Sequence, residues 1–545
     1  MNRWGVTAMV AALSFLSGGW LLQRGTRQPG GPSAYESARL FDDVLSHVQN
    51  YYVDSLPEGD LYQKATNGLL GELKDPYSVL LQGDDYRALT EQTTGNYAGL
   101  GIQIDVRDGW ITVVAPLPES PAERAGIETG DQIVEVDGKS TEGWKNDQAV
   151  KTLRGEPGSR VKIRVRRAGV TAPLAFELNR ATIHMRSVPA GTLFDGGVGY
   201  VSMNGVSETS AAELRKEVMA LRAKGAKSLV LDLRLNPGGL LDQGVKVADL
   251  FLDPKQEIVA TRGRARGSSR EYFDDAPQPW PDLPVVVLVN EGTASAAEII
   301  SGALQDHDRA VVVGTPTFGK GLVQTLFPIG EGTALKLTTA KWYTPSGRTI
   351  QRAARSEQEQ MDVASGEAGG KAATTVDTSI KARPIFRTDM GRVVRGGGGI
   401  VPDMIVRPDT LSTGEREFAK ALGEKLPVYR DVLTAYALAL KEQKAIPSAD
   451  FSVTPAMREE LRTRLKAKGV DIDAKVWAGA GALIDEQFGY EAVRYSFGRP
   501  AESLRRFRDD PQMQAALGLL RKASTPKDLL QLANVPAAKS TARNN

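Results

Sequence analysis

The stretch Pro284–Gln324, PVVVLVNEGTASAAEIISGALQDHDRAVVVGTPTFGKGLVQ, contains two apolar runs that each lead into a polar loop. The first run, Val285–Val289, is continuous, as in strands that are buried on both faces of a sheet. Small residues then indicate a helix that opens at Ser295. The second run, Ala310–Val313, leads to Lys320 between two glycines. The stretch therefore predicts alternating strands and helices, with a hydroxyl and an amine in the loops.

The composition is that of a globular protein with several domains. At 545 residues the chain is too long for one core, and its 25% charged and 41% hydrophobic residues are ordinary. Basic and acidic residues are mixed throughout and the formal net charge is +2, so we expect no nucleic-acid partner. The absence of cysteine excludes a thiol nucleophile and disulfides. Without an HExxH motif or a histidine pair at ligand spacing, we expect no metal and no cofactor.

The first residues indicate export. The uncharged segment Trp4–Gln23 is about as long as a minimal membrane span, so we interpret residues 1–27 as a retained signal anchor. A cleaved signal peptide, with the small residues Ser17–Gly19 as the cleavage site, stays the alternative. In both cases the rest of the chain is expected outside the cytoplasm, in the periplasm, anchored to the inner membrane if the segment is retained. Residues 28–37, rich in Gly, Pro and Ser, are predicted to be a linker.

Helical periodicity predicts an N-terminal helical domain over residues 38–95 and a C-terminal helical domain over residues 411–545. Between them, residues 169–410 alternate strand and helix patterns and are expected to form the α/β core, a mixed sheet with flanking helices. Within this core, residues 352–395 are predicted to be a flexible insertion, because Arg352–Thr378 is polar and without aromatic residues.

Residues 96–168 carry two specific motifs, SPAERAGI at Ser120–Ile127 and GDQIVEVDG at Gly130–Gly138. The segment resembles a PDZ domain. Such a domain adds a peptide to a sheet edge and holds its terminal carboxylate with the N–H groups of a Gly-rich turn. By position the turn is Tyr97–Ile102, and the predicted peptide-binding residues are Leu100, Gly101 and Ile102. The alternative is a PDZ-like scaffold whose groove takes no substrate.

Two other chemistries, a phosphate site at the glycine-lysine loop and a histidine base for Ser295, are disfavoured by the sequence. Gly314–Lys320 matches the GxxxxGK phosphate loop, but the next residue is Gly321 where a Ser or Thr hydroxyl is needed, and a strand pattern follows instead of a helix. A histidine base is also disfavoured, because His307 would lie roughly 18 Å from Ser295 at about 1.5 Å per helical residue.

A Ser/Lys pair remains. Lysine accepts a proton only when neutral, which costs about 4.6 kcal/mol at pH 7 from an ordinary pKa, and burial can lower that pKa by roughly 3–5 units. Gln324 is a neutral partner that orients the amine without raising its pKa. Ser295 at a helix start gains backbone N–H groups for an oxyanion. Taken alone, Ser295 would be interpreted as an ordinary helix N-cap.

Five motifs in a fixed order turn this pair into a family resemblance: LVLDLRLNPGG, EGTASAAEI, the GALQD helix end, TFGKGLVQ and LKLTTAKWYTPSGR. Over roughly residues 38–410 the chain resembles the carboxyl-terminal processing (tail-specific) serine proteases. The resemblance implies Ser295 as nucleophile, Lys320 as base and Gln324 as assistant. It also implies oxyanion donors from the backbone of Ala296 and of the glycine loop, either Gly238 or, as second choice, Gly239.

The resemblance implies an exported serine endopeptidase that cuts polypeptides near their C-termini, with the substrate's apolar C-terminus docked by the PDZ domain. An adaptor protein or a homo-oligomer is a possible partner. The alternative is an inactive PDZ adaptor on a degenerate protease scaffold. The insertion and the long helical tail depart from the simplest members of the family. We also expect Arg154 to link the PDZ segment to the core.

Overall fold

The computed structural model describes residues 33–167, 169–352 and 378–533. It contains two compact units, one of residues up to Leu81 with Leu326–Leu337 and one of Gln82–Thr325 with Thr338 onward. In the described part, no helix is long and apolar enough to cross a membrane. The predicted anchor at residues 1–27 lies outside the described residues.

The first unit begins with two helices, as predicted, α2 (Ala34–Tyr51) and α3 (Glu58–Gly71). Ser33 and Glu36 form a capping box that fixes the start of α2. Strand β1 (Val79–Gln82) follows, and α4 (Gly83–Thr94) belongs to the second unit.

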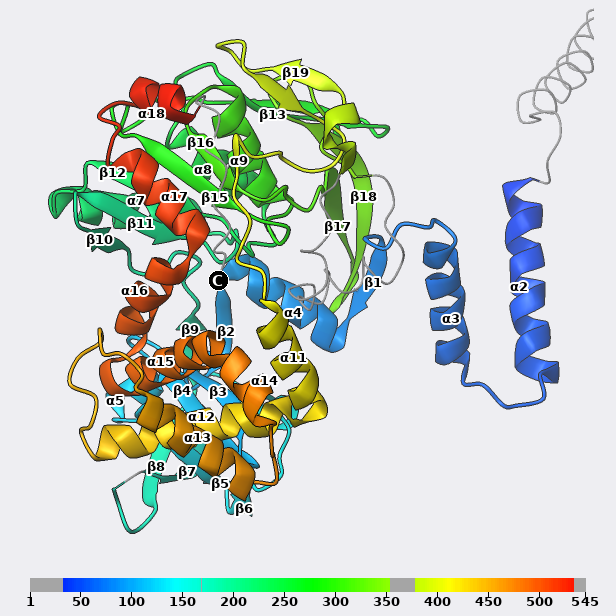
Figure 1. Ribbon diagram of the computed structural model, residues 1–545. Coiled ribbons are helices and arrows are strands. Elements are labelled where there is room, and N and C mark those ends of the chain that lie inside the picture. Colours follow the sequence, from blue (N-terminus) through cyan, green and yellow to red (C-terminus); the bar gives the residue numbers. More distant parts are fainter. Residues whose placement is uncertain (1–32, 168, 353–377, 534–545) are drawn as a thin grey trace, which may run out of the picture. The chain divides into compact units, whose positions relative to one another are not determined.

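The core of the second unit is a six-stranded mixed sheet, which confirms the predicted α/β class. Its order is β10-β11-β12-β15-β16-β21. Figure 1 labels the first five of these strands. Strands β11 to β21 are parallel and β10 is antiparallel. The strands are β10 (Thr192–Phe194), β11 (Val198–Ser202), β12 (Ser228–Asp232), β15 (Val285–Val289), β16 (Val311–Gly314) and β21 (Met404–Ile405).

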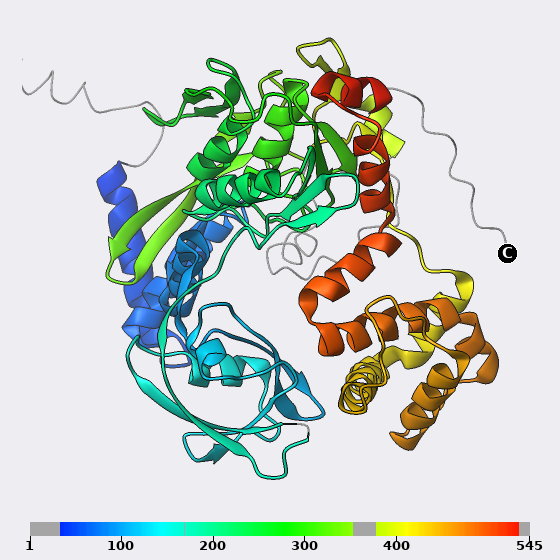
Figure 2. The same ribbon diagram turned by 90° about the vertical axis from the view of Figure 1, so that its left-hand side faces the viewer.

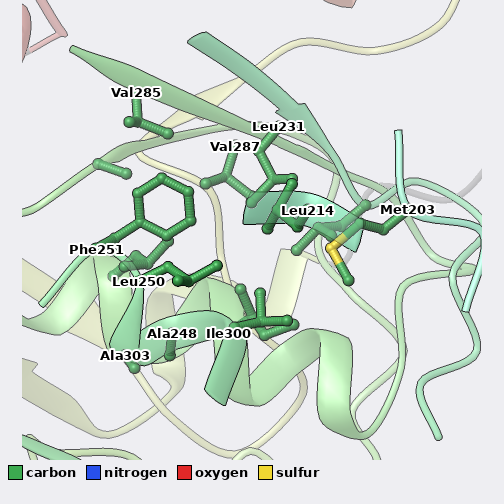
Figure 3. Packing of buried hydrophobic residues seen from close by; sticks show 14 of the residues in the cluster. Met203, Leu214, Leu231, Ala248, Leu250, Phe251, Val285, Val287, Ile300 and Ala303 are labelled. Atoms are coloured by element: carbon green, nitrogen blue, oxygen red, sulfur yellow. The ribbon is translucent and has the colours of Figure 1, made fainter. Parts of the chain in front are cut away.

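Both faces of this sheet are buried, which explains its continuous apolar strands. Val285 and Val287 face the helices α7 (Ser210–Ala223), α8 (Leu241–Asp249) and α9 (Ala296–Asp306), and Figure 3 shows Leu214 and Ile300 packed there. The alternate residue Val286 faces the opposite side, where α17 (Pro511–Leu520) and α18 (Pro526–Ala533) pack.

This second helical layer changes the predicted boundary at residue 410. Residues of α17 and α18 form part of the core of the protease sheet. A separate helical cluster is made by α11 (Thr413–Leu422), α12 (Leu426–Glu442), α13 (Pro455–Ala467), α14 (Ala474–Gly479) and α15 (Gly481–Phe497). Figures 1 and 2 show α16 (Arg499–Asp509) leading from that cluster to the sheet. Periodicity predicted the helices but not the surface that each one covers.

The predicted PDZ segment forms its own six-stranded sheet with a separate apolar core. The chain enters and leaves through a ribbon in which β2 (Asn96–Gly99) pairs with β9 (Ala181–His184). The sheet and its helices are β3 (Ile102–Arg107), β4 (Trp110–Pro116), α5 (Pro121–Arg124), β5 (Gln132–Val136), β6 (Lys139–Ser140), α6 (Asn146–Leu153), β7 (Arg160–Arg166) and β8 (Leu174–Asn179).

A further sheet lies beside the lysine loop. Strand β13 (Glu257–Gly263) pairs with β14 (Arg270–Phe273) and β18 (Thr333–Tyr343), and β17 (Leu322–Gly330) pairs with β18. Because β17 follows the lysine loop directly, the loop lacks the helix N-terminus that a phosphate site of the P-loop type requires.

The second half of the predicted flexible insertion at 352–395 contains regular secondary structure. Residues 378–395 contain a 3₁₀ turn (Thr378–Ala382) and the hairpin β19 (Ile385–Arg387) and β20 (Val393–Arg395). Arg392 fixes this hairpin by ion pairs of 2.5 Å to both Asp308 and Asp403. The segment is polar because its charges are paired, which composition alone does not reveal. Residues 353–377 lie outside the described residues.

Candidate active site

The candidate site lies where three neighbouring parallel strands end. Strand β12 leads into the glycine loop, β15 into Ser295 and β16 into Lys320. Loops at the carboxyl ends of adjacent parallel strands meet at one edge of the sheet, which is the usual position of a site in α/β folds. The topology therefore brings the predicted Gly238, Ser295 and Lys320 loops to the same edge.

Ser295 has the backbone of a strained functional residue. Its φ is 54° and its ψ is −119°, a conformation that non-glycine residues rarely adopt and that costs about 1–3 kcal/mol. Ser295 is the N-cap residue of α9, and its N–H donates to Glu298 Oε2 at 2.8 Å, as in a capping box. Ser295 is therefore a helix N-cap with a strained backbone, and the strain distinguishes it from an ordinary cap.

The glycine loop lies directly against the serine. A Cβ on Gly238 would fall 2.8 Å from both Ser295 Cβ and the Ala296 nitrogen, so only glycine fits. The Gly238 N–H donates to Asn236 Oδ1 at 2.9 Å in this conformation. Its predicted use as an oxyanion donor therefore requires that the Asn236 side chain release it. The Ala296 nitrogen is the first of α9, where helices have no internal acceptor.

Lys320 is half-buried in a loop that is fixed on several sides. A Cβ on Gly319 would lie 2.9 Å from the Gly399 nitrogen, so this position accepts no side chain. The Lys320 carbonyl accepts the indole N–H of Trp342 at 3.0 Å, and the Gly321 N–H donates to Gln351 Oε1 at 2.8 Å.

Glu298 joins the serine helix to the lysine loop, and sequence reasoning missed it. One oxygen, Oε2, accepts the Ser295 N–H and the Lys320 N–H at 2.9 Å. The other, Oε1, accepts the Thr317 hydroxyl at 2.5 Å and the Gly319 N–H at 2.7 Å. Complete burial raises the pKa of Glu298, and the four hydrogen bonds oppose that rise. The Ser-x-x-Glu spacing was the available signal, because it matches a capping box.

Gln324 lies on β17 and is half-buried. Its amide nitrogen donates to Thr338 Oγ1 on β18 at 3.2 Å. The hydrogen bond fixes the side-chain orientation of a residue four positions after Lys320. Its role as assistant of the base stays a prediction.

The histidines have other partners. His307 follows the last residue of α9, at the opposite end from Ser295, and its ring contacts Asp389 and the Glu257 carbonyl, each at 2.7 Å. His184 lies in β9 and contacts Glu213 at 2.6 Å. In the described ranges, no group of His, Asp and Glu side chains is arranged to hold a metal ion.

The predicted peptide-binding turn is shorter than expected, because Tyr97 is part of β2 and only two residues separate that strand from β3. Leu100 is buried in the domain core, and Ile102 begins β3 and is half-buried. A Cβ on Gly101, at φ 72°, would fall 2.2 Å from Ser120 Cβ, so the turn requires glycine. Peptide binding by these residues stays a prediction.

Arg154 connects the domain to α4. Its guanidinium binds Glu91 on α4 at 2.7 Å and lies 5.0 Å from the ring centroid of Tyr97. Helix α4 is in turn joined to the segment before α7, where the Glu208 N–H donates to the Thr93 carbonyl at 3.0 Å. The predicted link to the core therefore has a physical path through α4.

Comparison with known proteins agrees with this architecture. Residues 197–357 match the model of peptidase family S41, and residues 112–167 match that of a PDZ domain. A carboxy-terminal-processing protease of Bartonella bacilliformis is 39% identical over 323 residues, which cover 58% of this chain and 74% of the relative. The carboxy-terminal processing protease CtpA of Bacillus subtilis is 36% identical over 326 residues, 59% of this chain and 69% of that one.

Among solved structures, the photosystem II D1 C-terminal processing protease is similar, with 30% identity, coverage of 57% of this chain and 90% of that chain, and a TM-score of 0.33. The family assignment rests on the sequence relatives and on the two domain matches. The chain therefore belongs to the carboxy-terminal-processing serine proteases of peptidase family S41 and carries a PDZ domain.

Proposed function

We propose that this protein is an exported endopeptidase that cleaves polypeptides near their C-termini with Ser295 as nucleophile and Lys320 as base. The observation that carries the proposal is the Glu298 carboxylate, which binds the backbone N–H groups of both residues at 2.8 and 2.9 Å. A buried group that fixes two loops to each other supports a single two-part site. The strained backbone of Ser295 supports its role as the reactive hydroxyl.

In this mechanism neutral Lys320 takes the hydroxyl proton while Ser295 Oγ attacks the scissile carbonyl carbon. The resulting oxyanion is stabilised by the N–H of Ala296 and by one from the glycine loop, Gly238 or Gly239. The lysine ammonium then gives its proton to the leaving amine, and an acyl-enzyme remains. Lys320 next deprotonates a water molecule that attacks the ester, and the proton returns to Ser295 as the new C-terminus leaves. Gln324 orients the amine without adding charge.

In this proposal the PDZ domain binds the C-terminal end of the substrate. We infer that an apolar C-terminus docks at the turn that contains Leu100, Gly101 and Ile102, by addition to a sheet edge. The close approach of Gly101 to Ser120 supports a tight, preformed turn. Export through residues 1–27, to the periplasm with an inner-membrane anchor, belongs to the same proposal, as does the possibility of an adaptor or homo-oligomer.

Digestion of one unfolded protein, reduced and carboxymethylated α-lactalbumin, tests the chemistry. We expect fragments near its C-terminus, detected by mass, with activity that a chelator does not change. Ser295→Ala and Lys320→Ala should each lower the cleavage rate at least about a thousandfold without changing the far-UV CD spectrum. Cleavage by Ser295→Ala at the wild-type rate would refute the proposal. Appending a C-terminal Asp to the same substrate should raise KM if the PDZ turn selects apolar ends.

A further inference from the structure

The C-terminal helices contact the residue that opens the glycine loop. Arg234 follows β12 by two residues, and its Nη1 binds Asp510 Oδ2 at 2.6 Å and Gln512 Oε1 at 3.0 Å. Asp510 precedes α17 and caps it, accepting the N–H groups of Gln512 and Met513 at 2.9 and 3.1 Å. One carboxylate therefore fixes both the start of a helix and the start of the loop.

The loop needs such support from outside. The remaining bonds of the Arg234 guanidinium go to Asp232, at 2.7–3.1 Å, which lies only two residues away on the same strand. The next residue, Leu235, is held at a φ of 58°, which is strained for a branched apolar side chain that is 65% exposed. The contact with Asp510 therefore ties this strained turn to a separate element of the fold.

The same loop fixes the nucleophile segment. The Leu235 N–H donates to Asn290 Oδ1 at 2.9 Å, and the Asn236 carbonyl accepts the Ala294 N–H at 2.9 Å. Gly238 then lies against Ser295. These contacts form a continuous path from Arg234 to the backbone around the serine.

The environment strengthens the Arg234–Asp510 pair. The two side chains are 17% and 19% exposed, so water screens their attraction only partly. Tyr200 donates its hydroxyl to Asp232 Oδ2 at 3.0 Å, and its ring lies 4.5 Å from that of Phe507 on α16. The C-terminal helices thus contact both members of the Asp232–Arg234 pair.

We propose that Asp510 is a positioning residue of the active site, which fixes the glycine loop against Ser295 through Arg234. The inference rests on the proposed function, because that function gives the glycine loop its role in stabilising the oxyanion. The C-terminal helices then belong to the catalytic core.

Asp510→Ser tests this, because serine is as good an N-cap as aspartate but carries no charge for Arg234. Asp473→Ser is the matched control: Asp473 caps α14 in the same way, by accepting N–H groups at 2.8 and 3.3 Å. Each variant is assayed in the full-length protein for kcat and KM on carboxymethylated α-lactalbumin, for phosphonylation of Ser295 by a fluorophosphonate, and for thermal unfolding by CD.

We expect Asp510→Ser to lower kcat and the phosphonylation rate by about tenfold with KM within about twofold, because a displaced loop costs transition-state stabilisation and not binding. Asp473→Ser should keep wild-type rates. Arg234→Gln should lower kcat and phosphonylation in the same way, and adding Asp510→Ser should slow it no further, because the two residues act through one contact.

Wild-type kcat and phosphonylation in Asp510→Ser, while Ser295→Ala is inactive, would overturn this inference and leave the proposed function intact. Additive losses in the double variant, or equal losses in Asp473→Ser, would also overturn it. If Asp510→Ser unfolds at the assay temperature, Asp510→Asn and Asp510→Glu replace it. The kcat is then expected to fall from the wild type to Asp510→Glu and further to Asp510→Asn.

Discussion

Replacing Glu298 with glutamine tests how the serine helix and the lysine loop are held together. Glutamine has the same shape, but it offers one acceptor oxygen and one donor nitrogen to a site with four donors. If its nitrogen takes the place of Oε2, it faces the N–H groups of Ser295 and Lys320, and both lose their acceptor. If it takes the place of Oε1, it faces the Gly319 N–H, while the Thr317 hydroxyl can turn and accept.

The second orientation loses less stability, since it leaves only the buried Gly319 N–H without an acceptor, whereas the first leaves two N–H groups without one. An unsatisfied buried donor costs about 1–3 kcal/mol, and the remaining hydrogen bonds lose the strength that the charge gave them. We therefore expect Glu298→Gln to lower the free energy of unfolding by about 2–3 kcal/mol. We also expect kcat to fall by at least about a hundredfold, because a small misplacement of reacting groups is costly.

Glu291→Gln is the matched control, because Glu291 also joins the serine segment to the lysine segment, through the Thr315 hydroxyl at 3.0 Å, but contacts neither catalytic backbone. Urea unfolding gives the stability and digestion of carboxymethylated α-lactalbumin gives kcat. If Glu298→Gln keeps more than half of the wild-type kcat, or if Glu291→Gln loses as much, the reasoning about this carboxylate is refuted.

Three further substitutions follow from the packing. Gly321→Ala should abolish cleavage, because its Cβ would lie 2.9 Å from a backbone nitrogen across the loop, whereas Gly330→Ala, at the end of β17, meets nothing within 4 Å and should stay active. Burial raises the pKa of Asp274 to about 7. A raised pKa gives stability that is complete below the unfolded value and is lost as pH rises through about 7. Asp274→Asn should therefore unfold like the wild type at pH about 4 and be more stable by at most about 4 kcal/mol at pH about 9, and equal urea midpoints at the higher pH would contradict this. Leu517→Ala, in the helix layer on the core sheet, should lower the free energy of unfolding by about 2–4 kcal/mol, against less than about 1 for the more exposed Leu504→Ala.

The strands and helices of the core were predictable because burial leaves a clear pattern. The run Val285–Val289 is apolar throughout because alternate residues face two different helix layers. The strand pattern after Lys320 disfavours a phosphate site from the sequence alone. Ser295 and Lys320 were predicted from sequence motifs, and the loops that carry these motifs meet at one edge of the sheet.

Other features depend on contacts between distant segments. Helices α17 and α18 have an ordinary amphipathic pattern, and only the structure tells that they cover the core sheet. The hairpin of residues 385–395 was predicted to be flexible because the partners of Arg392 lie outside it. Asp308 is far away in the sequence, and Asp403 follows the hairpin. Glu298 did not stand out in the sequence, because its bonds to the lysine loop span 19 to 22 residues.

The rate at which a fluorophosphonate labels Ser295 in wild type and in Lys320→Ala tests the central claim most directly. Labelling depends on an activated hydroxyl and not on the identity of the substrate. Lys341→Ala, an exposed lysine on β18, is the control. The account predicts one adduct, mapped by mass to Ser295, that forms equally fast in the control and at least about a hundredfold more slowly in Lys320→Ala. An adduct on another residue, or unchanged labelling in Lys320→Ala, would contradict it.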